Sequence, residues 1–292
     1  MNEQFSGFLA RVEQFMARVE ASLPHGLEQP DWGASIAFRY RRRSSGQGLI
    51  SPVRHVGVMA LDDLKEIDAQ KEKIRRNTEQ FVRGATANNV LLTGARGTGK
   101  SSLIRACLHA FADQGLRLIE VDKSDLMDLP DLIEVVAQRP EKFIIFCDDL
   151  SFDEGEAGYK ALKSVLDGSV AASTPNVLIY ATSNRRHLLP EYMSENLSYT
   201  HTADGEVHPG EVVEEKISLS ERFGLWVSFY PFSQDEYLHI AAQWLTALGL
   251  PAAEIEAARP EALLWALERG SRSGRVAWQF ARDYAGRKGL GA

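Results

Sequence analysis

The feature of the sequence that most constrains its fold is a phosphate-binding motif at residues 94–101. These residues fit the pattern G-x-x-x-x-G-K-[ST] at every fixed position. An apolar segment at residues 90–93 precedes the motif, and a helical pattern at residues 102–111 follows it. In such a strand–loop–helix unit, glycines let successive backbone N–H groups face an anion beside the positive end of a helix. The motif therefore predicts a site for the phosphates of a nucleotide.

The residue types of the motif predict a role for each position. We expect Lys100 to reach the β- and γ-phosphates and the Ser101 hydroxyl to ligate Mg²⁺. The remaining phosphate contacts are expected from the loop and the first helical turn, namely Gly94, Ala95, Arg96, Gly97, Thr98, Gly99 and Ser102. Because the chain has no clear N/TKxD-type guanine signature, ATP with Mg²⁺ is the favoured ligand.

Polar residues follow two further apolar runs. Residues 143–147 form a continuous apolar run that ends in Asp148 and Asp149, and residues 177–182 are followed closely by Asn184. Ligands of open α/β sheets lie beyond the carboxyl ends of the strands. We therefore expect Asp148 to hold Mg²⁺ through water, Asp149 to orient or deprotonate the attacking water, and Asn184 to contact the γ-phosphate. The alternative is that these residues only cap or form turns.

The alternation of apolar runs with helical patterns predicts the fold class. Strands are expected at residues 90–93, 116–121, 143–147, 177–182 and 225–229, and a helix capped by Asp62 or Asp63 is expected to run to about Arg83. Beyond Pro231 only helical patterns occur, at residues 233–248, 260–269 and 272–286. We expect an α/β three-layer sandwich with a five-stranded parallel sheet and a small C-terminal helical lid.

Three regions are expected along the chain: an N-terminal region at residues 1–57, an α/β nucleotide-binding domain at 58–231 and the lid at 232–292. The first contains an amphipathic helix at residues 4–23 and an irregular arm at residues 24–57. The arm carries a basic, aromatic cluster at residues 38–43, which suits either single-stranded nucleic acid or an acidic protein surface. Residues 191–218 are expected to form a polar insertion that contacts a partner.

Composition narrows the classes of protein. The formal net charge of −7 argues against a molecule coated in positive charge for nucleic acid, although not against a local basic patch. No apolar run approaches the roughly 18 residues that a membrane span needs, so no membrane insertion is expected. Charged residues within the N-terminal apolar pattern argue against a signal peptide, and we expect a cytoplasmic protein.

These motifs together resemble those of the AAA+ ATPases over residues 58–286. Residues 94–101 resemble Walker A, residues 143–149 resemble Walker B, and residues 181–184 are similar to sensor 1. The resemblance implies that Arg222, within residues 220–224, is an arginine finger for a neighbouring subunit, so that the chain forms a homo-oligomer. It also implies that Arg275, within residues 273–275, reports the phosphate state to the lid as sensor 2.

A closer resemblance is to an uncharacterised bacterial AAA+ family, domain of unknown function 815. It rests on residues 77–81, 94–102, 147–152, 183–187 and 270–275.

One departure from the AAA+ pattern is Asp149, where most active members carry Glu. Because the side chain is one methylene shorter, and a shift of about 1 Å can lower a rate about a hundredfold, we expect slow turnover, or a base supplied by Asp153 or Glu154.

The sequence leaves alternatives open for the arginines and for the function. Arg222 could instead pair on the surface with Glu221 or Glu215, and Arg275 could be a solvated residue at the start of a helix. Arg185 and Arg186 are candidates for contacts between subunits.

The leading hypothesis is an ATPase that couples nucleotide state to remodelling of an oligomer or a protein client. The alternative is a nucleotide-gated binding switch or loader-like adaptor; a kinase is less favoured because no acceptor motif occurs.

Overall fold

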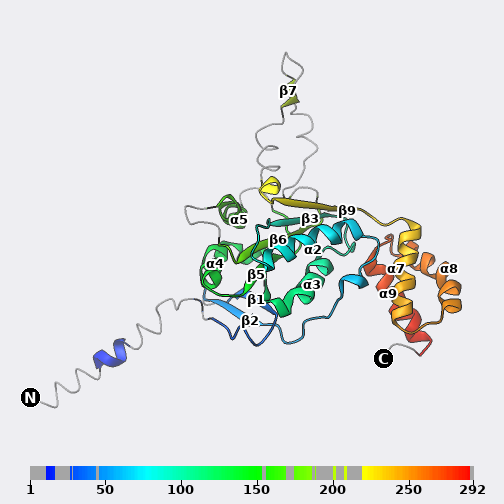
Figure 1. Ribbon diagram of the computed structural model, residues 1–292, viewed down its shortest axis with the longest axis horizontal. Helices are drawn as coiled ribbons and strands as arrows, with labels where there is room; N and C mark the ends of the chain where they lie inside the picture. Colours follow the sequence, from blue (N-terminus) through cyan, green and yellow to red (C-terminus); the bar gives the residue numbers. More distant parts are fainter. Residues whose placement is uncertain are drawn as a thin grey trace, which may run out of the picture.

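The computed structural model describes residues 11–16, 27, 29–43, 46–152, 156–168, 174–185, 188, 200–201, 207–208 and 219–289. Its centre is a seven-stranded sheet with the strand order β2-β1-β4-β5-β6-β3-β9 (Figure 1). The strands are β1 (Ala37–Arg42), β2 (Gly48–Pro52), β3 (Val90–Gly94), β4 (Leu116–Val121), β5 (Lys142–Cys147), β6 (Val177–Ser183) and β9 (Leu225–Phe229). A separate two-stranded ladder joins β7 (Thr200–His201) to β8 (Val207–His208).

The five predicted strands are confirmed as β3, β4, β5, β6 and β9, and neighbouring members of this set are parallel. Their side chains alternate between two apolar cores. Ile144 and Phe146 of β5 enter the core on one face of the sheet, whereas Phe143 and Ile145 enter the core on the other. A strand buried on both faces is apolar on both, which is why residues 143–147 of β5 form a continuous apolar run in the sequence.

Helices cover both faces of the sheet and complete the expected three-layer sandwich. The helices α2 (Asp68–Val82) and α3 (Lys100–Phe111) contribute to the first core, and α4 (Leu129–Ala137) and α5 (Ala157–Asp167) contribute to the second. Three short 3₁₀ helices are also present, η1 (Leu61–Asp63), η2 (Ala112–Gln114) and η3 (Lys123–Asp128). The helix expected from Asp62 to about Arg83 is therefore divided into η1 and α2.

The arm expected to be irregular instead adds two strands to the sheet. β1 runs parallel to β4, and β2 pairs antiparallel with β1 at the edge. The rings of Phe38 and Tyr40 are buried, while Arg39 and Arg42 form ion pairs with acidic residues, Arg39 with Glu120. One interpretation of the cluster, in which the bases of a nucleic acid stack on these rings, is therefore wrong, because the rings are buried. The cluster therefore forms a strand. Its aromatic side chains, at alternate positions, point into the core, and Arg39 and Arg42 form ion pairs with residues that are distant in the sequence.

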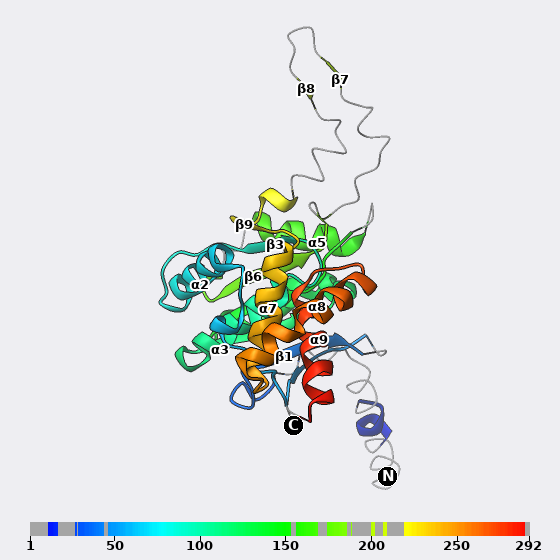
Figure 2. The ribbon, with the colours of Figure 1, turned by 90° about the vertical axis from the view of Figure 1, so that its right-hand side faces the viewer.

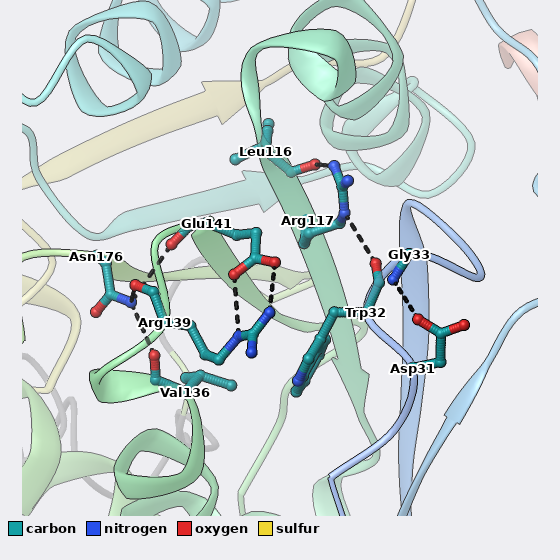
Figure 3. Close-up of polar contacts among 9 residues, drawn as sticks. All are labelled: Asp31, Trp32, Gly33, Leu116, Arg117, Val136, Arg139, Glu141 and Asn176. Atoms are coloured by element: carbon teal, nitrogen blue, oxygen red, sulfur yellow. Dashed lines mark hydrogen bonds and ion pairs between the residues drawn. The ribbon is translucent and has the colours of Figure 1, made fainter.

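Polar contacts join the neighbouring segments at the amino ends of β4, β5 and β6 (Figure 3). Asn176 Nδ2 donates to the backbone carbonyls of Val136 at 2.8 Å and Arg139 at 3.0 Å, and Arg139 pairs with Glu141. On the neighbouring strand, Arg117 Nε donates to a backbone carbonyl of the segment before β1 at 3.4 Å. These contacts fix the end of the sheet that lies away from the phosphate-binding motif.

The C-terminal residues form the predicted helical lid. It contains α7 (Gln234–Ala247), α8 (Ala252–Glu268) and α9 (Gly274–Arg287) and lies at one end of the sandwich (Figures 1 and 2). Ser233 starts α7 with a capping box, because its hydroxyl accepts from Glu236 N and its own N–H donates to the Glu236 carboxylate. α8 begins well before Pro260, which lies inside the helix rather than at its start as expected.

Two expected segments lie largely outside the described residues. Of the amphipathic helix at residues 4–23, only residues 11–16 are described, and they are helical. Of the insertion at residues 191–218, only the ladder of β7 and β8 is described. Within the described part of the chain, no helix is both long and apolar enough to cross a bilayer.

Candidate nucleotide-binding site

The phosphate-binding motif forms a curled loop between β3 and α3. The backbone adopts positive φ angles at Gly94 (123°), Gly97 (72°) and Gly99 (98°), a region that side chains other than glycine rarely adopt. A Cβ atom at Gly94 would lie 1.9 Å from the carbonyl oxygen of Phe229 on β9. The loop can therefore curl against the adjacent strand only because glycine occupies this position.

The tip of the loop also contacts the lid, and this contact yields a test. A Cβ atom at Gly97 would lie 2.9 Å from Cβ and Oγ of Ser273, the residue that caps α9. Gly84 has a similar φ of 78° with open space around it. We expect Gly97→Ala to lower the free energy of unfolding by about 2 kcal/mol or more, and Gly84→Ala by about 1 kcal/mol. Denaturant unfolding measures both values, and equal losses would contradict a tight contact between loop and lid.

Lys100 is buried at the start of α3 and is held by the loop itself. Its Nζ donates to the carbonyl oxygens of Gly94 (2.9 Å) and Ala95 (2.8 Å) and to Oδ1 of Asn184 (3.1 Å). Burial lowers the pKa of Lys100, and the nearby acidic pair opposes this shift. These acceptors hold the ammonium inside the curl of the loop, where it can exchange them for phosphate oxygens.

The first acidic residue, Asp148, is joined to the motif by short hydrogen bonds. Its Oδ1 accepts from the hydroxyl of Ser101 at 2.6 Å and from the hydroxyl of Thr182 at 2.5 Å. Thr182 Oγ1 in turn accepts from the backbone N–H of Asp149 at 2.9 Å. The structure thus brings the two expected Mg²⁺ ligands, Ser101 and Asp148, together at the carboxyl ends of β5 and β6.

The second acidic residue, Asp149, has an unusual backbone and a specific partner. Its φ is 52°, in the left-handed region, where Asp and Asn occur more often than most residues other than glycine. Asn184 Nδ2 donates to Asp149 Oδ1 while Asn184 Oδ1 accepts from Lys100. A single amide therefore connects Lys100, the expected phosphate ligand, to the expected water-activating carboxylate. The alternative bases Asp153 and Glu154 lie outside the described residues.

These groups line one cavity of about 770 Å³ between the α/β part and the lid. Five basic and three acidic side chains line it, namely Lys65, Arg96, Lys100, Arg105, Arg275, Asp63, Asp148 and Asp149. Within the described part of the chain, Arg96, Arg105 and Arg275 have no ion-pair partner. A positive balance in a chain of net charge −7 favours an anionic ligand at this position.

Not every expected site residue reaches the cavity. Arg222 lies outside its lining and pairs with Asp167 at the end of α5. Of the two partners that one reading expected, Glu221 and Glu215, the second lies outside the described residues. Arg185 is exposed directly after the β6 end, and Arg186 lies outside the described residues. Residues 96–102, the acidic pair, Asn184 and Arg275 thus gather in one cavity, whereas Gly94, Ala95 and Arg222 do not line it.

Sequence reasoning missed several residues of the cavity. Thr182 could have been found, because it lies two positions before Asn184 and so shares its face of the strand. Arg105 lies within α3, and Trp244 and Trp278 lie on two lid helices. No local pattern distinguishes these three from ordinary helical residues, since only the packing of the lid brings them to the cavity.

The cavity suits a triphosphate with Mg²⁺. The loop residues from Arg96 to Ser102 line it, and the oxygens of Asp148 and Ser101 are the hard ligands that Mg²⁺ prefers. Asp148 Oδ2 has no hydrogen-bond partner among the described residues, which leaves it open to a metal-bound water. Among those same residues, no cluster of three or more His, Cys, Asp or Glu could hold a metal ion by itself.

Comparison with known proteins agrees with the fold. Two RuvB variants from Thermotoga maritima are similar with TM-scores of 0.51, at 15% and 16% identity, over 76% of this chain and 63% of theirs. This chain therefore spans less than two thirds of the length of those proteins. An E. coli HORMA:CdnC:Trip13 complex gives a TM-score of 0.47 at 14% identity, over 76% of this chain and 90% of that one.

The sheet order, the phosphate loop and the lid define a protein with the AAA+ fold. Residues 33–288 match the model of the family described as "Protein of unknown function (DUF815)". The chain belongs to this family, and the match begins just before β1, so the two added strands are part of the matched region. No curated protein is similar in sequence.

Proposed function

We propose that this protein binds ATP with Mg²⁺, hydrolyses it slowly and couples the nucleotide state to remodelling of an oligomer or a protein partner. The observation that carries the proposal is the convergence of Lys100, Ser101, Asp148, Asp149 and Asn184 at one end of a positively lined cavity. Those five side chains come from the start of α3 and from the carboxyl ends of the neighbouring parallel strands β5 and β6, where ligands of this fold class bind.

Each residue has a distinct role in the proposed reaction. Mg²⁺, held by Ser101 and Asp148, would neutralise charge on the phosphate oxygens. Lys100 exchanges its carbonyl acceptors for phosphate oxygens, and Arg275 adds a second positive charge from the lid. Asp149 accepts a proton from the attacking water, and Asn184 orients that water or the γ-phosphate. Because the Asp149 side chain is short and already accepts from Asn184, we expect slow turnover.

The direct test is titration of the full chain with ATP and Mg²⁺ by calorimetry, together with measurement of phosphate release. Binding followed by slow release of phosphate is the expected result. Folded protein that gives no heat with ATP would contradict the proposal. Binding without release, even when candidate partners are added, would instead favour the nucleotide-gated switch or loader-like adaptor.

Arg222 is proposed to act on the site of a neighbouring subunit. It lies outside the cavity of its own chain, and a guanidinium delivered to another subunit's γ-phosphate can raise a rate by roughly 10³–10⁵. We expect Arg222→Ala and Lys100→Ala proteins to be inactive alone, but a mixture of the two to recover part of the turnover. Sedimentation of the mixture shows whether subunits assemble. An assembled but inactive mixture would contradict action between subunits.

A further inference from the structure

Part of the cavity lining is aromatic and apolar. Trp244 of α7 and Trp278 of α9 both line it, and their ring centroids lie 4.7 Å apart with an interplanar angle of 58°. The other apolar side chains of the lining come from the lid and from the segment before α2, namely Val58, Met59, Leu64, Ile67, Phe232 and Ile240. The rest of the lining consists of the phosphate loop, α3, the polar ends of β5 and β6, and Asp63, Lys65, Gly274 and Arg275. These aromatic and apolar side chains are therefore the part of the lining that suits a base.

Apart from the charged side chains Asp63, Lys65 and Arg275, few side chains in this part of the lining could read the edge of a base. Among the described residues that line the cavity, no Asn, Gln, Ser or Thr comes from the lid or from the segment before α2. Asp63 Oδ2 already accepts from the backbone N–H of Ala60 at 2.8 Å. Gln243, next to Trp244, directs its amide N–H groups to the backbone carbonyls of Asp62 and Asp63 at 3.3 and 3.4 Å.

We propose that Trp244 and Trp278 form a stacking surface for a purine base, so that the site accepts adenine and guanine nucleotides with similar affinity. The inference rests on the proposed function. Stacking uses the ring face, which adenine and guanine share, whereas discrimination between them needs donors and acceptors aimed at their edges. A pyrimidine offers a smaller ring face and binds more weakly. This expectation differs from the preference for ATP that the sequence motifs favoured.

The experiment compares full-length wild type and Trp278→Ala in titrations with ATP, GTP, CTP and inorganic tripolyphosphate, each with Mg²⁺. In wild type, the affinities for ATP and GTP are expected to differ by less than about tenfold, and CTP to bind more weakly. Loss of one stacking partner lowers the affinity for a base by roughly 5- to 100-fold. Trp278→Ala should therefore lower the affinities for ATP and GTP by this factor. Tripolyphosphate has no base, and its affinity should stay within about twofold.

Two variants serve as controls. Trp278→Phe keeps an aromatic ring and should retain most of the affinity for ATP and GTP. Tyr230→Ala removes an aromatic side chain that is 73% exposed and lies outside the cavity lining, and it should leave every affinity unchanged. Quenching of tryptophan fluorescence by ATP in wild type, reduced in Trp278→Phe, gives a second readout that does not depend on how well Trp278→Ala folds.

The outcomes separate this inference from the proposed function. A wild-type preference for ATP over GTP well above tenfold, or equal ATP affinity in wild type and folded Trp278→Ala, would overturn the stacking proposal alone. In both cases ATP still binds, so the proposed function stands. If neither ATP nor tripolyphosphate binds to folded wild type, the phosphate loop has no such ligand and both proposals fail together.

Discussion

Replacement of Lys100 by Ala is expected to weaken binding of ATP more than a hundredfold. The ammonium lies within the curl of the loop, where it is buried and held by two backbone carbonyls and Asn184. Charge-assisted hydrogen bonds contribute about 1.5–3 kcal/mol each, and loss of about 3 kcal/mol corresponds to more than a hundredfold in affinity. Calorimetric titration with ATP and Mg²⁺ measures the effect.

The matched control is Lys73→Ala on an exposed position of α2, outside the cavity lining. It should leave ATP affinity unchanged. We expect Lys100→Ala to change the free energy of unfolding by less than about 1 kcal/mol, because burial already disfavours the charged ammonium that is removed. A variant that unfolds would therefore contradict our account of the loop, and one that binds ATP normally would contradict the role of Lys100.

Replacement of Asp149 by Asn is expected to lower kcat at least a hundredfold while ATP binding is retained. The amide removes the proton acceptor but keeps the size of the side chain, and Asn tolerates the left-handed φ of 52° as well as Asp does. The fold should therefore be preserved. Phosphate release under saturating ATP measures kcat, and calorimetry measures binding in the same preparation.

Two comparisons sharpen the test of Asp149. Asp149→Glu restores the missing methylene, and we expect it to hydrolyse ATP faster than wild type, because a shift of about 1 Å in a base can change a rate about a hundredfold. Unchanged hydrolysis in Asp149→Asn would assign the base to another carboxylate, such as Asp153 or Glu154, and would contradict the role given to Asp149.

The central part of the fold could be predicted because its signals are local. Five largely apolar runs become the five parallel strands with bounds that differ by at most one residue, since strands buried on both faces have few polar positions. Asp148 and Asn184 could be placed together for a related reason. Parallel strands end at the same edge of a sheet, so residues that follow two such strands meet there.

The remainder depends on contacts between distant residues. In the sequence alone, β1 looks like a basic cluster. The acidic partners of Arg39 and Arg42, Glu120 and Asp128, belong to later elements of the chain, so the local sequence does not reveal them. The pairing of Trp244 with Trp278 depends on how α7 packs against α9, which helical periodicity does not determine. The hydrogen bond from Asn184 to Asp149 depends on how the segments that follow β6 and β5 are placed. Patterns in a single sequence contain no signal for this hydrogen bond.

The strand order has a consequence for synthesis of the chain. β3, which leads into the phosphate loop, pairs with β6 and β9, so its first strand neighbour is not translated until residues 177–183 and its second not until residues 225–229. At about 5–20 residues per second, a ribosome needs several seconds or more to cover this interval. The nascent chain therefore cannot use nucleotide to stabilise itself early, and the loop reaches its final form only when nearly all of the sheet has emerged.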